Sequence, residues 1–315
     1  MRLMPILLAW LLFVLPAYAF ETGTQECETA LDCARKSVVS LLPDWPPGIS
    51  RNEEPEGSGI VVGNGTLIAT ADHVLGLAKS ARIRTAEGRV IKAEIVLRDP
   101  ATDIAFLGIE KPLTAFGRPA DISIGEKSCA LGNSFGLGVS VSCGVISAKQ
   151  VSGTGFNPVE DFHQTDASVN PGMSGGALVN EEGRLVGMLS AIFTKQSDAN
   201  IGMNFAVSGQ LLQKVLNDYQ EHGVSRHRAT GVLVRPGNPV DHDGWIGAKV
   251  VRLEDGSIAD KAGIETDDLI ISVGQRRMLR AGAFEAAIVL AKAGLELDVL
   301  VLRDNDFHNL VMIPE

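Results

Sequence analysis

The chain has 315 residues, enough for two domains of ordinary size, and its 45% hydrophobic and 21% charged residues exclude an intrinsically disordered protein. The formal net charge of −10 disfavours nucleic acids and anionic membranes as partners. The 34 glycines and the aromatic fraction of 5% are typical of many short strands joined by tight turns.

The N-terminus has the features of a signal peptide over residues 1–19. Arg2 precedes an apolar run over residues 3–16, and Ala17-Tyr18-Ala19 supplies the small-x-small pattern that signal peptidase recognises. The run is shorter than the roughly 20 apolar residues that span a bilayer, so an uncleaved anchor is the weaker alternative. We expect cleavage directly after this pattern, a mature chain from Phe20, and a periplasmic or secreted location.

The central part of the chain has the pattern of a β protein. From Gly57 to about Val207, apolar and polar residues alternate with period two, and Asn64-Gly65 between two apolar segments is a strong hairpin signal. Many short strands with few helices between them predict antiparallel barrels or sandwiches. We expect strands over residues 60–62, 67–70, 81–85, 90–97, 104–109, 139–146 and 185–193.

The pattern changes after Gly209. Apolar residues at helical spacing over residues 210–222 predict a helix that closes the first domain, and the polar residues 222–227 predict a linker. A second unit follows, with an expected helix over 281–292 and strands over 298–303 and 309–313. We therefore expect one domain over residues 20–222 and a smaller one over 229–315.

Four cysteines in an exported chain favour disulfides over metal ligands, and four allow three connectivities. Cys129 and Cys143 lie almost symmetrically about the glycine-rich turn 133–138, as cross-strand partners in a hairpin would. Cys27 and Cys33 lie close together near the mature N-terminus. We favour the pairs Cys27–Cys33 and Cys129–Cys143, with buried free thiols as the alternative.

Three segments carry the residue types that activate a serine nucleophile. Residues 170–176 surround Ser174 with glycines, so that the N–H groups of Gly172 and Ser174 can point at an oxyanion. His73 ends a predicted strand and offers a general base, while Asp103 precedes an apolar strand and can orient the imidazole. Each segment alone is most often structural, as a turn, a strand end or a cap. Together they have the order His, Asp, Ser, which is that of trypsin-like proteases.

The motifs around these residues resemble those of the HtrA/Deg family of trypsin-like serine proteases. The family's nucleophile region is similar to DFHQTDASVNPGMSGGALVN (residues 161–180), and two further signatures are similar to ALGNSFGL (130–137) and NFAV (204–207). The resemblance extends from about residue 36 to the C-terminus. It implies a mostly β fold, in which two six-stranded barrels with the active site between them precede one PDZ domain.

The family resemblance also implies a function. It implies a serine endopeptidase that cleaves unfolded or exported proteins in quality control, or a single signalling substrate in regulated proteolysis, and it suggests a homotrimer. The competing hypothesis is a non-proteolytic PDZ chaperone or scaffold. We expect no cofactor, because the triad itself supplies nucleophile and base, and no metal, because the six histidines are dispersed.

By position, the resemblance assigns Val169 and Ile192 to the primary specificity pocket. Two aliphatic walls without an acidic residue imply a small or medium apolar side chain before the scissile bond. The resemblance assigns Ser190 and Ala191 to the strand that pairs with the substrate backbone.

The chain departs from the family pattern at two positions. Met173 stands where the family usually has Asn, but backbone N–H groups form the oxyanion hole, so we expect the hole to form without the Met side chain. His163 replaces a usual aliphatic residue, and we expect it to fill space, with a pH sensor as the alternative.

The C-terminal unit resembles a PDZ domain of the same family through GSIADKAGI (256–264) and DDLI (267–270). By position, the loop that captures a peptide's C-terminal carboxylate falls on Ala229, Thr230, Gly231 and Val232. The resemblance implies binding of hydrophobic C-terminal peptides. The alternative is a rigid β-module that only shapes an oligomer.

Overall fold

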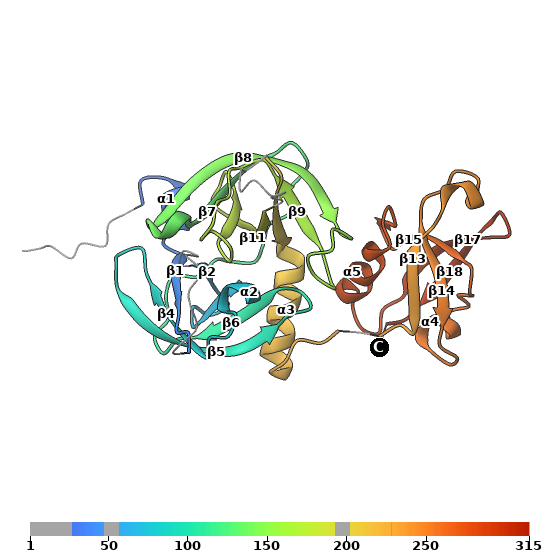
Figure 1. The fold of residues 1–315 in the computed structure, drawn as a ribbon, viewed down its shortest axis with the longest axis horizontal. Coiled ribbons are helices and arrows are strands. Elements are labelled where there is room, and N and C mark those ends of the chain that lie inside the picture. The colour runs from blue at the N-terminus through green and yellow to red at the C-terminus, as the bar shows by residue number, and fades with distance from the viewer. Residues whose placement is uncertain (1–26, 47–56, 193–201, 228, 315) are drawn as a thin grey trace, which may run out of the picture.

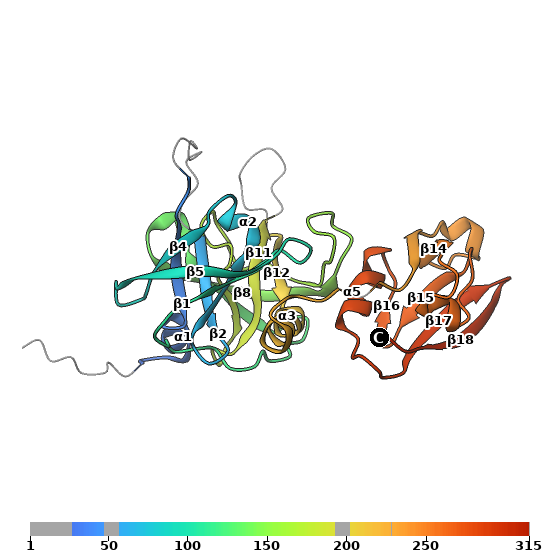
Figure 2. The same cartoon turned by 90° about the horizontal axis from the view of Figure 1, so that it is seen from below.

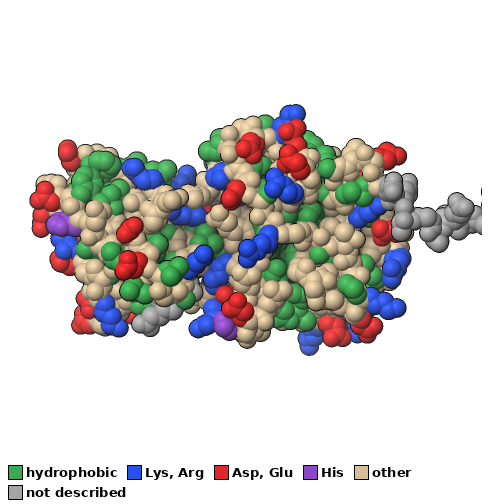
Figure 3. Space-filling view, turned by 180° about the vertical axis from the view of Figure 1, so that it is seen from behind, with side chains coloured by type: hydrophobic (Ala, Val, Ile, Leu, Met, Phe, Trp, Pro, Cys, Tyr) green, Lys and Arg blue, Asp and Glu red, His purple; other side chains and the backbone are tan. Residues whose placement is uncertain are grey.

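A computed structural model describes residues 27–46, 57–192, 202–227 and 229–314. The predicted signal peptide lies outside these residues. None of the helices in these four ranges has both the length and the apolar character needed to cross a membrane. On the face shown in Figure 3, acidic and basic side chains are interspersed rather than gathered by sign.

The first barrel is closed by six antiparallel strands in the order β1-β2-β3-β6-β5-β4. The expected hairpin at Asn64-Gly65 is confirmed, because Val62 pairs with Leu67 across the turn. The Asn64 side chain accepts hydrogen bonds from both the N–H and the hydroxyl of Thr66. The strands are β1 (Val38–Pro43), β2 (Gly57–Val62), β3 (Leu67–Ala71), β4 (Ser80–Arg84), β5 (Val90–Asp99) and β6 (Ile104–Gly108). The short helix α2 (Asp72–Leu75) follows β3.

The second barrel is also six-stranded and closed, in the order β10-β11-β12-β9-β8-β7. Its strands are β7 (Lys127–Asn133), β8 (Val139–Val151), β9 (Phe162–Thr165), β10 (Ala177–Asn180), β11 (Leu185–Ile192) and β12 (Asn204–Ser208). A 3₁₀ turn, η1 (Ser134–Gly136), joins β7 to β8. Figure 1 shows the two barrels stacked, the first in blue and cyan and the second in green and olive.

Two disulfides fasten the chain locally, and they join the same pairs as those expected from the spacing. The register of β7 and β8 places Cys129 directly opposite Cys143, with 4.0 Å between their Cα atoms. Cys27 is bonded to Cys33 in the N-terminal helix α1 (Ala30–Arg35).

Helix α3 (Gly209–His222) packs against both barrels, which confirms the predicted helix at the end of the first domain. Ser208 caps its N-terminus by accepting a hydrogen bond from the Leu211 N–H. At the other end Gly223, with φ +73°, takes the left-handed conformation that closes many helices. The apolar face of the helix joins the core shared by the barrels through Leu211, Leu212, Val215 and Leu216.

The C-terminal unit is a sheet with helices on it, and its strand order is β13-β14-β15-β17-β18, with β16 paired to β15. The bounds are β13 (Val232–Pro236), β14 (Ala248–Leu253), β15 (Leu269–Val273), β16 (Arg276–Arg277), β17 (Leu297–Arg303) and β18 (Asp306–Met312), with η2 (Pro239–His242), α4 (Ile258–Lys261) and α5 (Gly282–Leu290). The structure thus confirms the predicted fold class, a double β-barrel followed by a small α+β unit.

The C-terminal unit lies against the second barrel, with α5 on the side that faces the barrels (Figures 1 and 2). Arg276 and Asp161 form an ion pair across this contact, with 2.6 Å between Arg276 Nη2 and Asp161 Oδ1 and both side chains buried. A Cβ atom on Gly282 would lie 2.9 Å from the backbone nitrogen of Gly153, so glycine permits the close approach of the two units there.

Candidate active site

His73 is the second residue of α2, at the point where β3 ends. Its side chain is 52% exposed, so the imidazole faces the open side of the site. The helix is held at its start by an ion pair between Arg98 Nε and Asp72 Oδ1, 2.6 Å apart, and by the Asp72 N–H, which donates to the carbonyl of Asp103. These contacts fix the backbone of His73 beside Asp103.

Asp103 is a buried carboxylate whose oxygens accept three hydrogen bonds. His73 Nδ1 lies 2.8 Å from Oδ2, and the backbone nitrogen of His73 donates to Oδ1 at 2.9 Å. The Ser190 hydroxyl donates to Oδ2 at 2.7 Å. The backbone of Asp103 has φ +58°, an uncommon value for a residue other than glycine. The surrounding contacts hold its backbone in this conformation. A carboxylate at Nδ1 favours the tautomer with the proton there, which leaves Nε2 as the base.

Ser174 lies between the two barrels. Its carbonyl accepts a hydrogen bond from the Ser58 N–H of β2 at 2.9 Å, and its hydroxyl donates to the carbonyl of Ser190 on β11 at 3.2 Å. The next residue, Gly175, has φ +84°, and a Cβ there would lie 2.2 Å from the Ser58 carbonyl oxygen. Only glycine therefore lets the serine loop approach β2 this closely.

The loop before Ser174 is oriented by two hydrogen bonds. The Pro171 carbonyl accepts from the Phe135 N–H at 2.8 Å, and the Gly172 carbonyl accepts from the Ser58 hydroxyl at 2.7 Å. In a trans peptide the N–H points opposite to the preceding carbonyl, so the Gly172 N–H points away from Phe135. Gly172 itself has φ +92°, which glycine adopts without strain.

A chain of hydrogen bonds through Ser190 thus links the three candidate triad residues. Comparison with known proteins places the chain in a family. Residues 57–188, which include all three, match the model of the trypsin-like peptidase domain. The chain is also similar to a solved structure, the HtrA-type protease AlgW with tripeptide, with 31% identity, a TM-score of 0.70, and coverage of 90% of this chain and 95% of that one. The chain belongs to the HtrA family of serine proteases.

Curated HtrA relatives are similar over most of this chain. The periplasmic serine endoprotease DegP of Escherichia coli K12 is 33% identical over 265 residues, and the probable periplasmic serine protease do/HhoA-like of Haemophilus influenzae is 32% identical over 276 residues. These matches cover 81% and 83% of this chain but 56% and 58% of the relatives. The chain thus spans little more than half the length of the curated relatives.

Met173, at the position where HtrA proteins usually have Asn, has a role that the sequence did not indicate. Its side chain is 1% exposed and packs in the apolar core of the second barrel. Its sulfur also accepts a hydrogen bond from the Asn170 N–H at 3.4 Å. The Met side chain thus anchors the loop from inside the barrel, in addition to the backbone contacts of Gly172.

The structure describes the expected substrate-contacting residues only in part. Val169 is 3% exposed and packs in the core of the second barrel. Ser190 directs its hydroxyl to Asp103 and its carbonyl to Ser174. The side chains of Ala191 and Ile192 lie outside the described residues. The assignments of the specificity pocket and the substrate-pairing strand therefore stay predictions.

His163 lies on β9, opposite Ala206 of β12, and is 8% exposed. Burial lowers the pKa of His163 even though the neighbouring carboxylate of Asp161 acts in the opposite direction. Its Nδ1 atom is buried and has no hydrogen-bond partner in the part of the chain that the structure describes. A neutral, enclosed imidazole is consistent with a packing role near pH 7.

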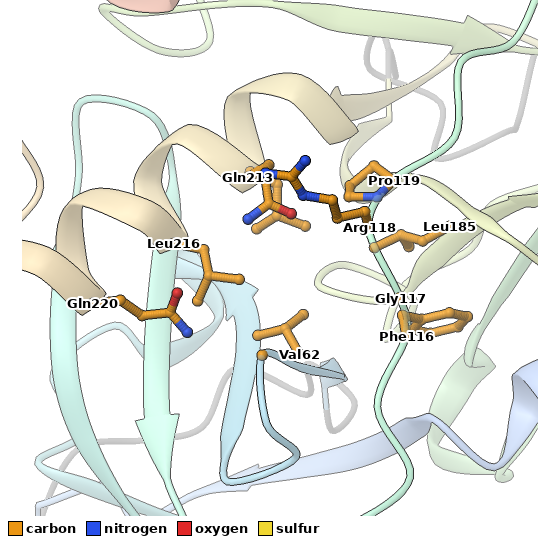
Figure 4. A pocket seen from close by; sticks show the side chains of 11 residues that line it. Val62, Phe116, Gly117, Arg118, Pro119, Leu185, Gln213, Leu216 and Gln220 are labelled. Carbon is orange, nitrogen blue, oxygen red and sulfur yellow. The ribbon is translucent and has the colours of Figure 1, made fainter.

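Two cavities lie away from the candidate triad. One, of about 170 Å³, is bordered by β2, the segment 116–119 and α3, and Figure 4 shows the Arg118 side chain reaching toward Gln213 across it. The other, of about 290 Å³, lies between β13 and α5 and includes the loop 229–232. No group of three or more His, Cys, Asp or Glu side chains in the described part of the chain is arranged to hold a metal ion.

Proposed function

We propose that this protein is a serine endopeptidase that cleaves unfolded or exported polypeptides in the periplasm or an equivalent compartment. The observation that carries the proposal is the hydrogen-bond chain through Ser190, which links the carboxylate of Asp103 to Ser174 while Asp103 also holds His73. The names of the relatives, periplasmic serine endoproteases, and the predicted signal peptide over residues 1–19 support the location.

The chemistry would follow from these contacts. His73 Nε2 accepts the hydroxyl proton as Ser174 Oγ bonds to the scissile carbonyl carbon, and Asp103 stabilises the imidazolium that forms. The imidazolium then donates this proton to the leaving amine as the C–N bond breaks, which leaves an acyl-enzyme. Water activated by His73 attacks the ester, and the proton returns to Ser174 as the acid product leaves.

The negative charge on the carbonyl oxygen would be stabilised by the N–H groups of Gly172 and Ser174. The orientation of the Pro171 carbonyl toward Phe135 supports this role, since it turns the Gly172 N–H the other way. On the substrate side, Val169 and Ile192 would select small or medium apolar residues, and Ser190 and Ala191 would pair with the substrate backbone.

The C-terminal unit would be a PDZ domain over residues 229–315 that binds hydrophobic C-terminal peptides. The predicted linker 222–227 would join it to a protease domain over 20–222. The carbonyls of Thr230 and Gly231 accept hydrogen bonds from the N–H groups of Ala259 and Glu254. The N–H groups of Ala229, Thr230 and Gly231 have no acceptor among the described residues, so they can bind a carboxylate. Similar HtrA structures contain a tripeptide or a decapeptide. Assembly as a homotrimer stays a prediction.

The test compares the mature protein from Phe20, with its cysteines oxidised, with its Ser174→Ala variant on an unfolded model protein. The proposal expects fragments from the wild type and none from the variant. A folded wild type that produces no fragments, even with hydrophobic C-terminal peptides added, would favour the non-proteolytic scaffold.

A further inference from the structure

The cavity between β13 and α5 is an apolar groove with a polar loop as part of its lining. Its walls are formed by Val232 of β13, by Phe284, Ile288 and Val289 of α5, and by Val159 of the second barrel and His227 of the linker. The loop 229–231, whose N–H groups have no acceptor among the described residues, lines the same cavity. A peptide added alongside β13 would direct alternate side chains toward α5.

Glu285 is the exception in the α5 wall. It lies one residue after Phe284 and one turn before Val289, and it lines the same cavity. Its carboxylate accepts a hydrogen bond from its own backbone N–H and forms no ion pair within the described residues. Partial burial raises the pKa of Glu285 above its ordinary value, which shows that its charge is poorly solvated there. Arg252 and Glu254 also line the cavity, but neither forms an ion pair with Glu285.

The other enclosed carboxylates of the described residues are held by several hydrogen bonds, as Glu160 is by Thr154, Phe156 and Asn157, or by a cation. Asp268 pairs with Arg303 at 2.7 Å, Asp161 with Arg276 at 2.6 Å, and Asp99 with His227 at 2.9 Å. An unpaired, partly desolvated carboxylate is costly unless a cation approaches it, and a ligand can supply that cation. Glu285 therefore differs from them in a way that suits a charged ligand.

We propose that this groove selects peptides that carry Lys or Arg two residues before a hydrophobic C-terminal residue, and that Glu285 determines this preference. The proposal rests on the PDZ function proposed above. One turn of α5 advances about 5.4 Å, and two residues of an extended peptide advance about 6.8 Å. Val289 and Glu285, one turn apart, therefore match the peptide side chains at the last position and at the third from last, respectively.

The experiment uses the mature chain with Ser174→Ala, so that peptides are not cleaved, and measures binding by fluorescence anisotropy. Three labelled peptides end in the same hydrophobic residue and carry Lys, norleucine or Glu at the third position from the end. A fourth peptide is the Lys peptide with an amidated C-terminus. We expect the Lys peptide to bind roughly tenfold more tightly than the norleucine peptide, the magnitude of a charge-assisted hydrogen bond.

Glu285→Gln, added to the same background, is expected to abolish the Lys preference and to change the affinity for the norleucine peptide by less than about twofold. Glu296→Gln removes an exposed carboxylate of the same unit outside the groove, and this control is expected to keep the preference. Thermal unfolding of both variants checks that they fold.

The outcomes separate the two proposals. Binding that needs the free carboxylate but shows no preference for Lys, or a preference that survives in Glu285→Gln, overturns the role of Glu285 and leaves the PDZ function intact. Absence of binding by every peptide to a folded protein, with no difference on amidation, overturns the PDZ function and this inference with it.

Discussion

The Ser190 hydroxyl donates a 2.7 Å hydrogen bond to Asp103 Oδ2, although 87 residues separate them in the chain. Ser190 belongs to the second barrel and Asp103 to the first, so this bond crosses the interface at which Ser174 lies. Since the Ser190 carbonyl also accepts from Ser174 Oγ, one residue of β11 positions two members of the proposed triad.

Ser190→Ala removes this hydrogen bond and is expected to lower kcat about ten- to hundredfold, because a hydrogen bond to a charged group contributes about 1.5–3 kcal/mol. Ser190→Thr keeps a hydroxyl and is expected to retain most of the activity. The measurement is steady-state cleavage of a peptide substrate over a range of pH. Equal losses in both variants, or a loss confined to KM, would contradict a role in positioning Asp103.

The ion pair between Arg276 and Asp161 is expected to stabilise the contact between the C-terminal unit and the second barrel. Arg276→Met leaves the buried Asp161 carboxylate with the Ser208 hydroxyl as its one remaining side-chain donor among the described residues. We expect the free energy of unfolding to fall by about 3–5 kcal/mol, the cost of breaking a buried ion pair. Denaturant unfolding measures the loss, and limited proteolysis reports exposure of the linker. The double variant Arg276→Met with Asp161→Asn is expected to recover part of the stability. A double variant less stable than the single one would show that the unpaired charge is not the cause.

Acid is expected to destabilise the protein through His163. Its folded pKa lies below the ordinary value of 6.5 because the imidazole is buried. As the pH falls below 6.5, the unfolded chain binds a proton that the folded chain excludes, so stability present above that pH is lost on acidification. The test compares the melting temperatures of the wild type and His163→Leu. They are measured between about pH 7.5 and 5, roughly the range where histidine titrates. The aliphatic variant is expected to lose less stability over that range, and an equal loss in both proteins would assign the acid sensitivity to other groups.

The sequence could predict the parts of this protein that depend on local patterns. The hairpin at Asn64-Gly65 follows from turn chemistry, and the helix over 210–222 follows from apolar periodicity and a polar cap. The order of His73, Asp103 and Ser174 indicated the site because each lies in a distinctive segment.

What the sequence could not predict depends on contacts between distant residues. Ser58 has no motif of its own, yet it donates hydrogen bonds to the carbonyls of Gly172 and Ser174 in the serine loop. Gly172 lies 114 residues from Ser58 in the chain. Arg276 and Asp161 are 115 residues apart, and nothing local indicates that either is buried. Glu285 follows an apolar residue in an ordinary helical pattern, and only the placement of α5 beside the cavity it shares with β13 brings it into the groove.

The most direct test of the central claim is labelling of the folded, mature protein with a fluorophosphonate probe, followed by peptide mapping. The account predicts one modified serine, Ser174, with no labelling in Ser174→Ala and labelling slowed by several powers of ten in Asp103→Asn. Labelling at a different serine, or no labelling of a folded wild type with or without hydrophobic C-terminal peptides, would contradict it.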